Sequence, residues 1–136
     1  MRKWLVLFLF SIFSAIFCAA AMAHDLHRWN EVEGGIWSPS HFLVVLMDSQ
    51  IDALILATAT KENKTTPPLD RYTFQYQGQQ TGAQKIIKIH AYCHAPQDFN
   101  PRHHWHVVAD GGSCFFEAVF DASSHSFSQF RFHGEG

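Results

Sequence analysis

Two stretches of the sequence alternate apolar and polar residues, and each carries one cysteine at the matching end of the pattern. From Ile87 to Cys93, and again from Cys114 to Phe120, every second residue is apolar. Such alternation is typical of half-buried β-strands. If the strands pair antiparallel with the cysteines opposed, apolar residues face apolar residues, and a shift by one residue would destroy the match. The sequence therefore predicts a Cys93–Cys114 disulfide and the opposed pairs Ala91–Phe116, Ile89–Ala118, Ile87–Phe120 and His90–Glu117.

The first 23 residues have the composition of an export signal. Arg2 and Lys3 precede an apolar stretch over residues 4–17, and Ala21-Met22-Ala23 matches the small-x-small site of signal peptidase. Because the apolar stretch is shorter than the roughly 20 residues of a spanning helix, we expect cleavage after Ala23 and no membrane span in the mature chain. The expected location is periplasmic or secreted, where two thiols in a small domain usually form a disulfide.

The mature chain, residues 24–136, is expected to form a single domain. Apolar residues make up 47% of the sequence and charged residues 16%, which is typical of a globular protein. Loss of Arg2 and Lys3 leaves 8 of the 10 basic residues against 12 acidic ones, a formal charge of −4. This balance argues against a basic, nucleic-acid-binding face. All ten histidines lie after residue 23, and their protonation below a pH of about 6.5 would raise the net charge.

The remaining pattern predicts one helix followed by about five antiparallel strands. Residues 24–37 lack a clear period and are expected to form a short helical turn or an irregular arm. Ser38-Pro39 favours a helix start, and Asp48-Ser49-Gln50 favours its end. Residues 51–60 are β-branched and apolar enough for a buried strand. Further strands are expected over residues 72–77 and around Phe130 and Phe132, with a turn over Gly78–Gly82.

This pattern belongs to the α+β class, with an N-terminal helix packed on one face of an antiparallel sheet. The order of elements resembles that of cystatin-like and NTF2-like folds. The resemblance concerns the architecture alone, because such folds carry many unrelated functions.

Residues 95–112, between the two cysteine strands, are expected to leave the sheet as a loop closed by the disulfide. Long loops on a rigid scaffold commonly carry recognition, and Trp and Arg are typical interface anchors. The candidate binding residues are Trp105, Arg102, Phe99 and His103. We therefore expect an exported binding or inhibitor-type domain that presents this loop to a protein or ligand partner.

An alternative arrangement makes residues 104–109 a strand of the sheet. His104 and His106 would then point to one side, and His94 from a neighbouring strand would complete a three-nitrogen site for zinc or copper. Cys93 and Cys114 would lie too far apart for a disulfide, so the two arrangements exclude each other. With the disulfide formed, a metal would require the loop to fold around it.

Motifs of catalysis are otherwise missing from the sequence. It contains no phosphate-binding glycine loop and no activated-serine motif. His90 opposite Glu117 could act as an acid–base pair, but such cross-strand contacts are common on exposed sheet faces.

Cleavage would also place His24 at the N-terminus near His27, an amine–imidazole pair that suits copper. If the chain is a binding domain, we expect no cofactor. If the histidines bind a metal, we expect zinc or copper.

Overall fold

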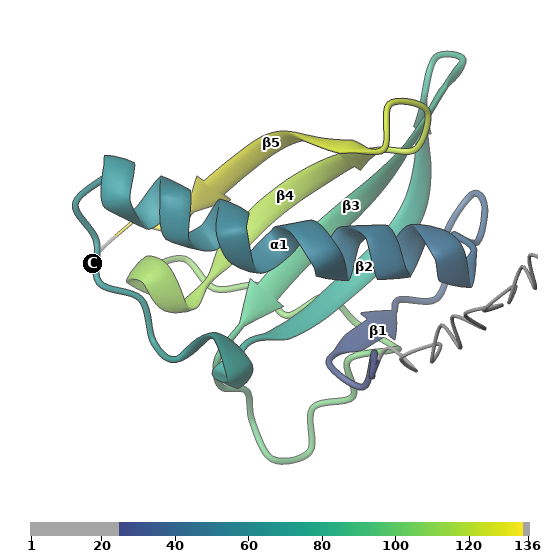
Figure 1. Cartoon of the computed structure of the whole chain (residues 1–136). Helices are drawn as coiled ribbons and strands as arrows, with labels where there is room; N and C mark the ends of the chain where they lie inside the picture. The colour runs from purple at the N-terminus through teal and green to yellow at the C-terminus, as the bar shows by residue number, and fades with distance from the viewer. Residues whose placement is uncertain (1–24, 135–136) are drawn as a thin grey trace, which may run out of the picture.

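The structure is a computed structural model that describes residues 25–134, so the predicted export signal and His24 lie outside the described residues. One helix, α1 (His41–Lys61), lies across one face of a five-stranded sheet (Figure 1). The strands neighbour one another in chain order. They are β1 (Trp29–Glu31), β2 (Thr73–Thr81), β3 (Gln84–Tyr92), β4 (Phe116–Asp121) and β5 (Ser126–Phe132). The predicted α+β class is confirmed, but β1 runs parallel to β2, so the sheet is mixed and not wholly antiparallel.

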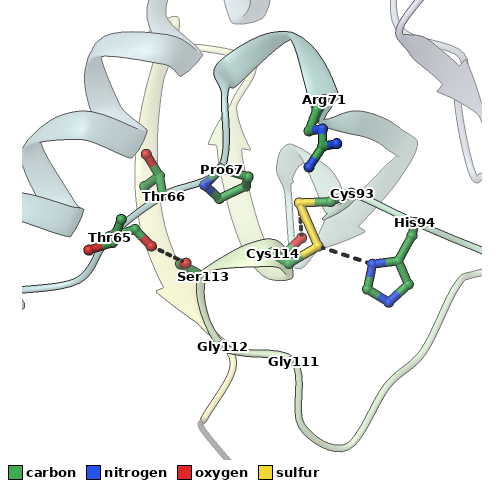
Figure 2. Close-up of a pocket in the computed structure, with 10 residues that line it drawn as sticks. All are labelled: Thr65, Thr66, Pro67, Arg71, Cys93, His94, Gly111, Gly112, Ser113 and Cys114. Carbon is green, nitrogen blue, oxygen red and sulfur yellow. Dashed lines mark hydrogen bonds between the residues drawn. A yellow bond between two sulfur atoms is a disulfide. The ribbon is translucent and has the colours of Figure 1, made fainter.

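The pairing of β3 with β4 has the register that the cysteines predicted. Beyond the strand ends this register brings Cys93 to Cys114, whose Cα atoms are 5.3 Å apart and whose sulfurs form a disulfide (Figure 2). Residues 103–109 form no strand, so the alternative hairpin is wrong. The opposed pairs are Ile87–Phe120, Ile89–Ala118, Ala91–Phe116 and His90–Glu117.

α1 is longer than predicted, because it continues through the polar residues 48–50 and includes residues 51–60, which the pattern predicted as a strand. Asp48 does not end the helix, since its carboxylate accepts hydrogen bonds from the side chains of Arg28 and Trp29. The buried residues recur every three or four positions without a break, which is the helical period. They are Val44, Met47, Ile51, Ile55 and Ala59.

The segment before α1 is more regular than the sequence indicated. Instead of a helical turn or an irregular arm it contains β1, whose Trp29 stacks on Phe74 with ring centroids 4.4 Å apart. A strand of three residues has too few positions to show an alternation, so the pattern missed it. α1 then begins at His41, and the N-cap is Ser40, not Ser38, with its hydroxyl accepting a backbone N–H of the first turn.

The predicted turn over Gly78–Gly82 is also wrong. β2 runs on to Thr81, and the turn consists of Gly82 and Ala83 between the paired ends of β2 and β3. A Cβ atom on Gly78 would lie 2.1 Å from the carbonyl oxygen of Trp37, so this glycine marks a close approach of two backbones. Gly82, with a φ of 61°, supplies the left-handed conformation that the turn needs.

The hydrophobic core lies between α1 and the facing side of the sheet. By length and composition alone α1 could cross a membrane, since its mean hydropathy is 1.7. Its buried stripe, however, packs on the sheet as the core helix of a folded domain does. Since length and composition do not decide between the two, the absence of a membrane span from the mature chain stays a prediction. The sheet residues in this core include Phe74, Ile87, Ile89, Phe116 and Phe120.

Candidate functional site

The loop of residues 95–112 folds back over the outer face of the sheet, which is the face opposite α1 (Figure 1). Gln75 in β2 fixes it there. Its side-chain amide donates hydrogen bonds to the carbonyl oxygens of Pro101 and His104, at 2.8 and 2.6 Å. Its carbonyl oxygen accepts the backbone N–H of His106 at 2.7 Å. Because Gln75 is fully buried, these three bonds satisfy an amide that has no access to water.

A group of ring contacts, here called the outer cluster, holds the same loop on β3. It consists of Tyr92, Phe99, His106 and Phe115. The His106 ring lies 4.9 Å from Tyr92, 5.1 Å from Phe99 and 5.5 Å from Phe115, centroid to centroid. Phe99 also meets the edge of Tyr92. The predicted binding residue Phe99 is therefore half-buried, with part of its ring packed in this cluster.

The other predicted binding residues differ in their exposure. Arg102 and His103 are exposed, and His103 Nε2 lies 3.4 Å from a carboxylate oxygen of Glu33. Trp105 is half-buried, with its ring 4.5 Å from that of His90 and 5.0 Å from the ammonium nitrogen of Lys88. The ammonium group over the ring face makes a cation–π contact that stabilises this position of the indole.

Lys88, which contacts the Trp105 ring, also lines a groove of about 500 Å³ on the outer face of the sheet. Its walls come from β2, β3, β4 and β5, and Glu117 and Arg131 form an ion pair at 2.7 Å between two of these strands. Val107, in the loop, is 73% exposed near a smaller hollow that shares Glu117 and Arg131. We call loop residues 102–107, of which Arg102, His103, His104 and Val107 are exposed, together with this groove the recognition surface. The residues that line the groove include Gln79, Lys88, Glu117, Val119, Gln129 and Arg131.

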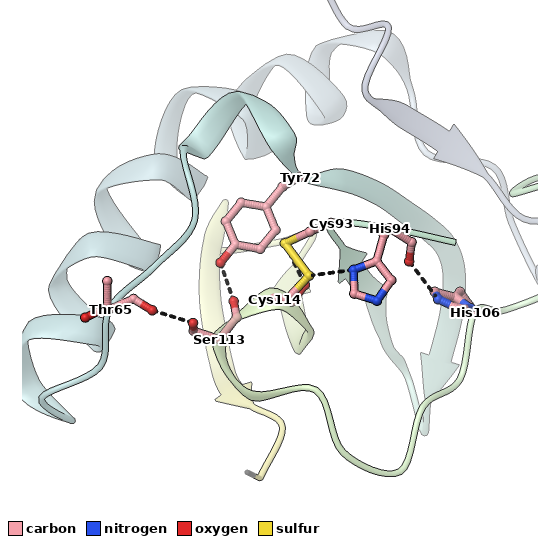
Figure 3. Close-up of a disulfide and its surroundings, with 7 residues drawn as sticks. All are labelled: Thr65, Tyr72, Cys93, His94, His106, Ser113 and Cys114. Atoms are coloured by element: carbon pink, nitrogen blue, oxygen red, sulfur yellow. Dashed lines mark hydrogen bonds between the residues drawn. A yellow bond between two sulfur atoms is a disulfide. The ribbon is translucent and has the colours of Figure 1, made fainter. Parts of the chain in front are cut away.

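The three histidines of the metal hypothesis are only partly brought together. His106 Nε2 lies 3.1 Å from the backbone carbonyl of His94, and His94 Nδ1 lies 3.6 Å from Cys114 Sγ (Figure 3). The ring of His104 instead lies near that of His103. Within residues 25–134 no three His, Cys, Asp or Glu side chains are placed to hold a metal ion. At the N-terminal end, His27 pairs with Asp25 at 2.9 Å.

His90 and Glu117 are neighbours as predicted, but His90 is buried and the pair is not an exposed decoration of the sheet. His90 Nε2 lies 3.3 Å from Glu117 Oε1 without hydrogen-bond geometry. Burial lowers the pKa of His90, as do Lys88 and His133, against the opposite effects of Glu117 and the carbonyl of His106. Burial alone would raise the pKa of Glu117, but its net shift is downward because Arg131 and the two histidines favour the carboxylate.

From the lowered pKa of His90 we expect the domain to lose stability in acid. The unfolded chain takes up this proton at a pH of about 6.5, above the pH at which folded His90 does. The free energy of unfolding should therefore fall as the pH drops through about 6.5, until the folded pKa is reached. His90→Gln should flatten the loss between pH 7 and pH 5, as measured by urea unfolding.

His104→Gln is the matched control, since His104 is an exposed histidine of the loop. It should leave the acid-induced loss unchanged. Equal losses in the wild type and in His90→Gln would show that burial of neutral His90 does not cause the acid sensitivity.

A second cavity, of about 580 Å³, adjoins the disulfide at the base of the loop (Figure 2). Its walls come from the segment after α1, from η1 (Leu69–Arg71) and from η2 (Gly112–Cys114). Tyr72 supports this end, since its hydroxyl donates to the carbonyl oxygen of Ser113 (Figure 3). Burial raises the pKa of Tyr72 to about 12, so its hydroxyl stays a donor at physiological pH.

Sequence reasoning missed Gln75, and it also missed Arg71, which lines the disulfide cavity. In the alternation of residues 72–77 every polar position predicts a side chain on the outer face, and nothing distinguishes Gln75 from an exposed residue there. The loop that buries it comes from residues more than twenty positions later in the chain, so no local signal could have identified it.

Comparison of the chain with protein-family models, with curated proteins and with solved structures found no match.

Proposed function

We propose that this chain is an exported binding domain of the inhibitor type, which uses the recognition surface to hold a protein or ligand partner outside the cytoplasm. As part of this proposal, the order of elements resembles that of cystatin-like or NTF2-like folds. This resemblance is supported by the helix followed by four antiparallel strands, β2 to β5. The leader over residues 1–23 supports export.

One observation carries the proposal: the loop is held at three places and still exposes side chains. The disulfide closes its base, Gln75 holds its backbone and the outer cluster packs its interior. Residues 102–104 and Val107 nevertheless face solvent, next to a groove with charged and apolar walls. A loop ordered in advance loses little conformational entropy on binding, which favours affinity.

The surface can be tested by site-specific photocrosslinking. A photoreactive amino acid at position 107 should form adducts with the partner in the extracytoplasmic fraction of the native host. The same group at position 56 should form none, because Leu56 is 48% exposed on α1, on the opposite side of the sheet. Adducts from position 56 and none from position 107 would refute the proposed surface.

Trp105→Ala should weaken binding of the crosslinked partner about thirtyfold or more, since a buried aromatic anchor is typically worth about 2 kcal/mol or more at an interface. His104→Ala should have a smaller effect. His106→Ala would not serve as a comparison, because His106 belongs to the outer cluster and its loss would disturb the loop itself. Isothermal titration measures both affinities, and thermal melts check that each variant is folded.

The histidine-based metal hypothesis remains the alternative outcome of the same series. One equivalent of tightly bound zinc or copper, lost in His94→Ala and unaffected by Trp105→Ala, would support metal binding and contradict the partner-binding proposal.

A further inference from the structure

The disulfide lies in the wall of a cavity that has the dimensions of a small-ligand site. About 580 Å³ of space adjoins both cysteines, each of which is half-buried and not sealed in the core. The cavity is at the base of the loop and shares no lining residue with the groove of the recognition surface. Among the described residues, its lining contains no Asp or Glu.

The two sulfurs have different surroundings. His94 Nδ1 lies 3.6 Å from Cys114 Sγ, whereas Cys93 Sγ lies 3.2 Å from the carbonyl oxygen of Cys114 (Figure 3). In the tautomer that carries its proton on Nδ1, His94 donates toward Cys114 Sγ and would stabilise a thiolate there. A carbonyl oxygen beside a sulfur opposes negative charge on it, because both atoms carry electron density. Cys114 is therefore the better thiolate leaving group.

The cation on the other side of the disulfide is Arg71. Its guanidinium points toward the disulfide in Figure 2, and it lines the same cavity. The hydroxyl-bearing residues Thr65, Thr66 and Ser113 complete the polar part of the wall. A fixed positive charge in a cavity without acidic lining attracts an anion, so the cavity favours a thiol that also carries carboxylates.

We infer that this cavity is a thiol–disulfide exchange site for a small anionic thiol. The thiolate sulfur attacks Cys93 Sγ and forms a mixed disulfide with it. The Cys93–Cys114 bond breaks, and its electron pair stays on Cys114 Sγ as a thiolate beside His94. The proton lost by the incoming thiol balances the one that Cys114 takes up when it becomes a free thiol, so the exchange needs no further oxidant or reductant.

The test uses the purified, disulfide-bonded protein and three thiol probes under native conditions. Reduced glutathione is anionic, 2-mercaptoethanol is neutral and cysteamine is cationic, and each is used at the same thiolate concentration. Iodoacetamide traps the freed cysteine, and peptide mass spectrometry locates the adduct. We expect glutathione on Cys93, alkylation on Cys114, and a rate about tenfold faster with glutathione than with cysteamine.

Two variants separate the roles of the cavity residues. Arg71→Gln should abolish the preference for the anionic thiol, whereas Arg102→Gln, a change of an exposed arginine outside the cavity, should keep it. His94→Gln should slow all three thiols and keep their order, because it acts on the leaving group. His104→Gln is the matched histidine control and should leave the rates unchanged.

An adduct on Cys114, exchange only in denaturant, or an unchanged preference in Arg71→Gln would each overturn the inference. The assay requires no binding partner, so its failure would leave the proposed recognition function untouched.

Discussion

Replacing Gln75 with leucine should destabilise the domain by about 3 kcal/mol, since a buried polar group left without its partner costs about 1–3 kcal/mol. The variant removes the side-chain amide of Gln75, which donates two hydrogen bonds and accepts one. The carbonyls of Pro101 and His104 and the N–H of His106 then lose their partner. The loop can regain water for these groups only by lifting from the sheet. Urea unfolding should record the loss of stability, and amide exchange should rise in residues 100–106.

Gln79→Leu is the matched control. Gln79 lies on the same face of β2, and its side-chain amide donates a hydrogen bond to the side chain of Gln77 and not to the loop. It should cost less than about 1 kcal/mol and leave exchange in the loop unchanged. Gln75→Leu should also weaken partner binding, since it loosens the loop that carries Trp105. A Gln75→Leu variant with wild-type stability and loop protection would mean that the outer cluster and the disulfide suffice to hold the loop.

Ile55→Ala should cost about 3–4 kcal/mol, within the range for removing a large apolar side chain from a core. Ile55 is fully buried on the stripe of α1 that packs on the sheet. The loss combines the transfer free energy of the deleted methyl and methylene groups with the cavity that remains. Urea unfolding monitored by circular dichroism measures it.

The adjacent Leu56 provides the comparison, because it is 48% exposed on the outer side of the same helix turn. Leu56→Ala should change stability by less than about 1 kcal/mol, since alanine also has the higher helix propensity. Similar losses at the two positions would contradict the packing of α1 described here.

Local alternation was enough to predict the centre of the sheet. In β3 and β4 one face is buried against α1, so the period of two in the sequence records the register directly, and the cysteines supply a second condition that the same register meets. The same local reading failed at residues 51–60. β-branched and apolar residues there favour a strand, yet burial at every third or fourth position on α1 overrides that preference.

The candidate site was predictable in its location but not in its roles. The disulfide register placed residues 95–112 off the sheet, and Arg102 and His103 in this loop are exposed. Phe99 and His106 instead pack in the outer cluster. Whether an aromatic side chain of a loop faces solvent or its own scaffold depends on the surface onto which the loop folds, and no spacing in the sequence encodes that surface.

The sequence by itself determined the strands β2, β3 and β4 in outline, the pairing of β3 with β4, and the disulfide that closes the loop. These features depend on periodicity within short segments, which the order of residues carries directly. Only the tertiary structure decided that Asp48 lies within a helix, that Gly78 accommodates Trp37, and that Gln75 is the buried anchor of the loop. In each case the deciding contact comes from a residue far along the chain, and a polar residue or a glycine has the same local pattern whether that contact forms or not.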